Sequence, residues 1–108
     1  MISRIVDCHI RPDKLNEFRK TLDTEVLPKV ERQQGFVDVL ETIDNKTGHF
    51  VCTTLWESLQ DVENYDRGLF QEVAQRLMPL LQEQPQVHTM TVQTSSAHAI
   101  SSGKSAAA

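Results

Sequence analysis

The sequence is poor in the residues on which several common kinds of site depend. Its 108 residues include only two cysteines, Cys8 and Cys52, which excludes a disulfide-dense scaffold. No ligand pair has the close spacing of a metal site, and Cys8 and His9 would point to opposite faces of a strand. There is no glycine-rich phosphate loop and no nucleophile elbow. We therefore expect no metal site and no cofactor.

Basic clusters and long apolar runs are also missing. Asp and Glu (15) outnumber Lys and Arg (11), and no window combines basic with aromatic residues, which argues against a nucleic-acid surface. The apolar runs are too short to span a bilayer, and the first residues, with Arg4 and Asp7, lack a signal peptide's apolar segment. We expect a cytoplasmic protein with neither nucleic acid nor membrane as a partner. Its cysteines should stay reduced, although neighbouring strands would allow a disulfide.

The composition is that of one small globular domain. Hydrophobic residues make up 39% of the chain and charged residues 24%. A domain of this size buries only about 60 to 65% of its unfolded surface, so help from a second copy would be unsurprising. From residue 95 onward Ser and Ala dominate, with almost nothing to bury. We expect a domain over residues 1–94 and a disordered tail over residues 95–108.

The stretch from His49 to Ser58, HFVCTTLWES, is the one around which the chain is organised. β-branched and aromatic residues dominate it, which predicts a strand. Alternation divides its residues between two faces, one with Phe50, Cys52, Thr54 and Trp56 and the other with Val51, Thr53, Leu55 and Glu57. Neither face is clearly polar, which indicates a central strand covered on both sides. Ser58 and Asp61 then start a helix, so Trp56 lies at a strand-to-helix junction.

Three further stretches alternate in the same way. Strands are expected at residues 2–10, 36–43 and 86–94. The first has two faces, with Ile2, Val6, Cys8 and Ile10 on one and Ile5, Asp7 and His9 on the other. The turn-rich residues 44–48 join the second strand to the stretch from His49, so these two form a hairpin.

Two helices complete the pattern. The first runs from Pro12 to Gly35, with a bend or split at Pro28, because proline lacks the backbone N–H. The second has bends expected at Gly68 and Pro79. The apolar stripe of the first helix, at spacings of three and four, is Leu15, Phe18, Leu22, Val26 and Val30. The stripe of the second is Leu59, Val62, Tyr65, Leu69, Phe70, Val73, Leu77 and Leu80.

The order of elements is therefore β-α-β-β-α-β. With right-handed crossovers this order predicts an α+β ferredoxin-like fold, in which both helices lie on one face of a four-stranded antiparallel sheet. The other face, with Val51 and Leu55, has no cover within the chain. An apolar face of this kind is normally closed by a partner, which predicts a twofold homodimer that packs sheet against sheet.

Several of these features together resemble the antibiotic biosynthesis monooxygenase domain of the dimeric α+β barrel superfamily. They are the order of elements, the WES junction at 56–58, the helix with Tyr65 and Phe70, the helix-then-Gly at Gly35, and the ending from LMPLL to VHTMTV. The resemblance covers residues 1–94. It implies a homodimeric barrel with a hydrophobic pocket between sheet and helices in each subunit. Some members oxidise polycyclic phenols to quinones without metal or flavin, some open heme, and many have no known activity.

The match of functional residues to this family is mixed. Trp56 corresponds to the family's Trp, and Arg76 falls near the Arg of the quinone-forming members. Those enzymes carry an Asn where this chain has Cys52. The heme-degrading members use an Asn on strand one and a His on helix two, whereas this chain offers Asp7 or His9 and no matching helix His. Heme is therefore not expected.

Two hypotheses follow for function. A cofactor-free monooxygenase of a small aromatic or polyketide-like substrate would use His9 as base, Trp56 to hold the ring and Arg76 to stabilise the anion. The residues expected to bind that substrate are Cys52, Thr54, Tyr65 and Phe70. The alternative is a non-catalytic dimeric module that binds a small apolar or aromatic molecule. It treats Trp56 as packing, Arg76 as a solvated charge and His9 as a half-exposed strand residue, and the missing Asn favours it.

Overall fold

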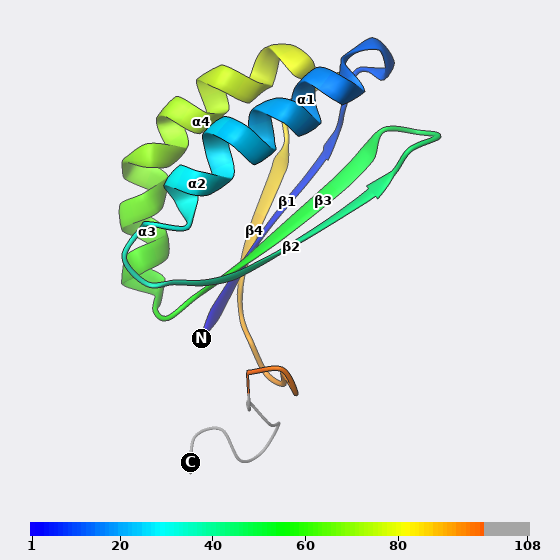
Figure 1. The fold of residues 1–108 in the computed structure, drawn as a ribbon. Helices are drawn as coiled ribbons and strands as arrows, with labels where there is room; N and C mark the ends of the chain where they lie inside the picture. Colours follow the sequence, from blue (N-terminus) through cyan, green and yellow to red (C-terminus); the bar gives the residue numbers. More distant parts are fainter. Residues whose placement is uncertain (99–108) are drawn as a thin grey trace.

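The computed structural model describes residues 1–98, in which four strands form one antiparallel sheet. The strands are β1 (Ile2–His9), β2 (Phe36–Asp44), β3 (His49–Trp56) and β4 (Gln86–Thr91). Their order is β2-β3-β1-β4, so β1 and β3 are central. The helices all lie on one face of the sheet (Figure 1). The predicted ferredoxin-like α+β fold is confirmed.

The first helical segment is built from four short pieces. They are η1 (Pro12–Lys14), α1 (Leu15–Thr21), the π-helical turn η2 (Leu22–Val26) and α2 (Leu27–Val30). Pro28 has no N–H to donate to the preceding turn, and the helix widens there into a π turn. The predicted split near Pro28 thus takes the form of one wider turn.

The end of this helix was predicted at Gly35, and that position is wrong. The helix ends at Val30, and residues 31–35 form a turn into β2. Gly35 has a φ of +84°, a conformation that glycine adopts without steric cost. Its carbonyl accepts a hydrogen bond from the Glu57 N–H at 2.8 Å, which holds the turn against the end of β3.

The second helical segment divides at Gly68. Its pieces are α3 (Leu59–Arg67), α4 (Leu69–Leu77) and the 3-10 turn η3 (Met78–Leu80). Ser58 caps α3, because its hydroxyl accepts from the Asp61 N–H at 3.2 Å and donates to the Asp61 carboxylate at 2.8 Å. The capping predicted from the Ser58–Asp61 spacing is confirmed.

The core lies between the sheet and the helices. Its fully buried side chains are Ile10, Phe18, Trp56 and Val62. Within residues 1–98, no helix covers the opposite face of the sheet, and on that face Leu40 is 64% exposed and Met90 is 52% exposed. Within residues 1–98, none of the helices is both long and apolar enough to cross a membrane.

The structure describes the first residues of the segment predicted to be a disordered tail. Residues 96–98 form a turn, and the His98 Nε2 lies 3.0 Å from the Asp38 Oδ2 on β2. This contact brings the segment after β4 to the strand at the opposite edge of the sheet. The rest of that tail, residues 99–108, lies outside the described residues.

We predict that Gly35→Ala destabilises the fold by about 1 to 3 kcal/mol, because a non-glycine residue at this φ is strained. An added Cβ would also collide with the side chain of Asp61, whose carboxylate accepts a hydrogen bond from the capping residue Ser58. Gln34→Ala, at the exposed neighbouring position, is the matched control and should stay within about 0.5 kcal/mol. Urea unfolding measures both variants, and equal midpoints would contradict the prediction.

Candidate ligand-binding cavity

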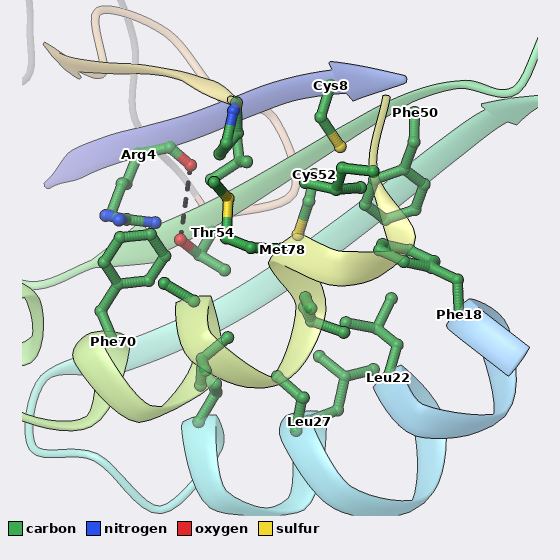
Figure 2. Close-up of a pocket in the computed structure, with 18 of the residues that line it drawn as sticks. Arg4, Cys8, Phe18, Leu22, Leu27, Phe50, Cys52, Thr54, Phe70 and Met78 are labelled. Carbon is green, nitrogen blue, oxygen red and sulfur yellow. Dashed lines mark hydrogen bonds between the residues drawn. The ribbon is translucent and has the colours of Figure 1, made fainter. Parts of the chain in front are cut away.

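A largely apolar cavity lies between the sheet and the helices (Figure 2). The sheet contributes Arg4, Val6, Cys8, Phe50, Cys52 and Thr54. The helical segments and the chain that follows them contribute Phe18, Leu22, Val26, Leu27, Val30, Tyr65, Phe70, Val73, Ala74, Leu77, Met78, Leu81 and Pro85. These strand residues are the ones on β1 and β3 whose side chains point toward the helices. The alternation of side chains along the two central strands therefore decides which residues form this wall.

The space inside the cavity is small, with a volume of about 80 Å³. A cavity of about 150 Å³ in another protein binds benzene, so a bicyclic ligand would need side chains of this wall to move apart. Apolar pockets with a few polar groups are the usual form of small-molecule sites.

Arg4 is the one charged residue in this wall, and it is only 3% exposed. Its Nε donates to the Asp66 Oδ1 at 2.8 Å. Its guanidinium carbon lies 4.2 Å from the ring centroid of Phe70 and 5.1 Å from that of Tyr65, so cation–π contacts add to the ion pair. Sequence reasoning missed Arg4 as a site residue, although it occupies an inward position between Ile2 and Val6.

Thr54 and Trp56 form a short hydrogen-bonded chain beside Arg4. The Trp56 Nε1 donates to the Thr54 Oγ1 at 2.9 Å, and the Thr54 hydroxyl donates to the Arg4 carbonyl at 3.4 Å. Trp56 is fully buried, and its ring lies 5.0 Å from that of Tyr65. Trp56 is not among the residues that line the cavity, and it contacts two residues that do, Thr54 and Tyr65.

The wall includes three ionisable groups that are neutral at physiological pH. Burial raises the pKa of the Tyr65 hydroxyl to about 12, with Arg4 acting in the opposite direction. Burial likewise raises the pKa of the Cys52 thiol to about 12 and that of Cys8 to about 11. Cys52 is opposite Val6 on β1, so the two cysteines are offset in register, and both are free thiols.

The four residues predicted to bind substrate all lie in this wall: Cys52, Thr54, Tyr65 and Phe70. The three predicted catalytic residues do not. Besides the buried Trp56, His9 lies on the outer face of β1, where its ring stacks on that of His49 at 4.6 Å and its Nδ1 lies 3.2 Å from Glu83. Arg76 is half exposed and pairs with Glu25 at 3.0 Å. The structure thus brings neither His9 nor Arg76 into the cavity.

Glu41 is a second ionisable residue on the inner face of the sheet that the sequence analysis did not single out. It is paired with Cys52 in the β2–β3 register and so faces the helices. Its Oε2 is buried and has no hydrogen-bond partner among residues 1–98. Burial raises the pKa of this carboxyl, and the nearby Asp23 raises it further. Within residues 1–98, no three His, Cys, Asp or Glu side chains gather as metal ligands would.

Comparison with solved structures identifies the architecture. A monooxygenase from Streptomyces coelicolor, the product of the gene ActVA-Orf6, in complex with nanaomycin D, superposes with a TM-score of 0.74. The match has 18% identity and covers 87% of this chain and 88% of that one. The chain shares its fold with solved structures named as antibiotic biosynthesis monooxygenases. The resemblance inferred from the sequence is confirmed at the level of the fold.

Two further solved structures share this monooxygenase fold. A Bordetella bronchiseptica protein named for antibiotic biosynthesis monooxygenases has a TM-score of 0.71 and 20% identity, over 84% of this chain and 95% of that one. Rv0793 from Mycobacterium tuberculosis has a TM-score of 0.72 and 16% identity, over 88% and 97%. No family model and no curated protein matches the sequence.

We predict that Glu41→Gln stabilises the protein at pH 7 by about 1 kcal/mol, because a neutral amide costs less to bury than an ionised carboxylate without a partner. The pKa of Glu41 is raised above its ordinary 4.5, so its contribution to stability is fully present below that pH and is lost as pH rises through the folded-state pKa. Removing the charge should therefore help at pH 7 and not at pH 4.

The comparison uses urea unfolding at both pH values. Glu63→Gln, on the exposed side of α3, is the matched control and should change stability at neither pH. A gain for Glu41→Gln that is equal at pH 4 and pH 7 would show that ionisation of Glu41 is not the cause.

Proposed function

We propose that this protein binds a small aromatic or polyketide-like molecule in the cavity, and that it binds such molecules better than it turns them over. The observation that carries this function is the cavity itself, which has an apolar body and one charged residue, Arg4, in its wall. The phenyl rings of Phe18, Phe50 and Phe70 in that wall suit a flat ring system. The Streptomyces coelicolor neighbour in complex with nanaomycin D supports a ligand of this kind.

The polar groups of the cavity explain why binding is the better-supported activity. Oxygen chemistry without a cofactor needs a base to remove a proton and donors that hold the developing negative charge. His9 and Arg76 were predicted for these roles, and both lie outside the wall. Cys52 offers a neutral thiol, which is a weak hydrogen-bond donor, where the quinone-forming enzymes that the sequence resembles carry an Asn amide.

A cofactor-free monooxygenase is the second candidate, and one feature favours it. Tyr65 and Arg4 adjoin each other in the wall, so a phenolic hydroxyl and a guanidinium are both available to an oxyanion. Their presence would support slow turnover even without a base in the cavity. Removing one donor of this kind typically lowers a rate by a factor of about 10² to 10³, so a site with some donors retains part of the catalysis.

We predict that 2-naphthol binds to the protein in isothermal titration calorimetry, and that oxygen uptake with it is slow. Ala74→Leu places extra methyl groups in the cavity and should weaken binding roughly tenfold or more, since overpacking costs about 1 to 3 kcal/mol. Ala97→Leu, the same substitution at an exposed position, is the control and should bind as the unmodified protein does. Cys52→Asn restores an amide and should raise oxygen uptake.

These assays distinguish the binding module from the monooxygenase. Rapid oxygen consumption by the unmodified protein would establish the monooxygenase and refute the binding module. Equal affinity of the Ala74→Leu and Ala97→Leu variants would mean that the ligand binds elsewhere. Absence of binding by 2-naphthol and by related bicyclic compounds would refute both candidates.

The proposed functional unit is a homodimer closed through the outer face of the sheet. Leu40 and Met90 are the exposed large hydrophobic residues on that face, and Val51 and Leu55 on β3 lie between them. Sheet-to-sheet contact would bury this apolar surface and leave the cavities on the far side of each sheet. Binding of ligand and association of subunits then use opposite faces of the same strands.

We predict that Leu40→Glu weakens the dimer at least tenfold, because a charge would be desolvated in the interface. Leu40 is 64% exposed in the subunit, so the substitution should leave the subunit folded. Leu59→Glu, at a 51% exposed leucine on α3, is the matched control and should not affect association. Sedimentation at micromolar concentration decides the question, and a monomeric unmodified protein would refute the dimer.

A further inference from the structure

Arg4 makes one end of the cavity different from the other. Arg4 and Phe70 lie together at one end, while Phe18 and Phe50 lie together at the other (Figure 2). Every other residue in the wall is apolar or carries a neutral polar group. A ligand that fills this space therefore meets a cation at one end and hydrocarbon along the rest of its length.

The contacts of the guanidinium leave one part of it available. Its Nε is used by Asp66, and the rings of Phe70 and Tyr65 lie close to it at cation–π distance. Among residues 1–98, the two Nη groups have no hydrogen-bond partner. A guanidinium that stacks on aromatic rings uses its flat faces, so its N–H groups, which lie in its plane, stay free. Two parallel N–H groups match the two oxygens of a carboxylate.

The ion pair with Asp66 only partly cancels the positive charge on the cavity side. Asp66 is 38% exposed, whereas Arg4 is 3% exposed. Water screens the carboxylate of Asp66 more strongly than it screens the buried guanidinium. An anion that reaches the Nη groups from the cavity would therefore meet a net attraction in an environment of low polarity.

We propose, building on the proposed binding function, that the natural ligand is an apolar molecule with one carboxylate, and that Arg4 binds this group through its Nη atoms. A carboxylate is ionised at neutral pH and presents two oxygens to the fork. A simple phenol is mostly neutral there and presents a single oxygen. The ring of Tyr65 lies beside the guanidinium, and its hydroxyl keeps its proton and can still donate.

Three ligands of one shape test this inference: 2-naphthoate, 2-naphthamide and 2-naphthol. Calorimetry with the unmodified protein should give the carboxylate an affinity at least tenfold above that of the amide, as expected for charge-assisted bidentate hydrogen bonds. Equal affinities for the carboxylate and the amide would overturn the inference and leave the proposed binding function intact. Failure of all three compounds to bind would instead refute the binding function itself.

Two variants of opposite effect exclude a merely structural role. Arg4→Met keeps a long apolar side chain, so it should remove the preference for naphthoate while naphthamide still binds. Asp66→Asn removes the competing carboxylate and should strengthen naphthoate binding at least threefold without changing naphthamide binding. If Arg4→Met fails to fold, Asp66→Asn alone decides, because only a guanidinium that faces the ligand predicts a selective gain. An unchanged or reduced affinity for naphthoate in Asp66→Asn would overturn the inference.

Discussion

The rest of the structure depends on the strict alternation of the two central strands, β1 and β3. Each strand has one face toward the helices, and the paired register places those faces side by side across the sheet. The same period-two rule determines which residues close the core, which line the cavity and which remain on the outer face. A shift of one residue in β3 would exchange Cys52 and Thr54 for Val51 and Thr53, and the cavity would lose its present wall.

The fold was predictable because its signals are local and agree with one another. The stretch from His49 to Ser58 combines alternation, a terminal tryptophan and a helix cap, and each of these is read within a few residues. The four binding residues predicted for the cavity followed from inward strand positions and helical stripes. The end of the first helix was missed because four residues separate Val30 from Gly35, and both are plausible helix ends by composition.

The charged part of the site was not predictable in the same way. Arg4 is tolerated at an inward position because Asp66, 62 residues away in the chain, and two aromatic rings receive its charge. No local sequence pattern predicts an ion-pair partner so far away in the chain. His9 and Arg76 were chosen for their chemistry, whereas strand phase and helix rotation place them on other surfaces. The types of residue thus predicted which side chains could take part in chemistry. Only the folded structure shows which of them lie together in the cavity.

The π turn at Leu22–Val26 has a consequence for how this cavity can vary. A π turn accommodates one residue more than an α-helix of the same length, so it is structurally equivalent to a single-residue insertion. Leu22, Val26 and Leu27 of this region all line the cavity. Loss of one residue here would rotate every later side chain of the helix by about 100°, given 3.6 residues per turn. Homologous chains can therefore reshape this wall by a change of length in one helix, without any substitution in the sheet that carries Arg4.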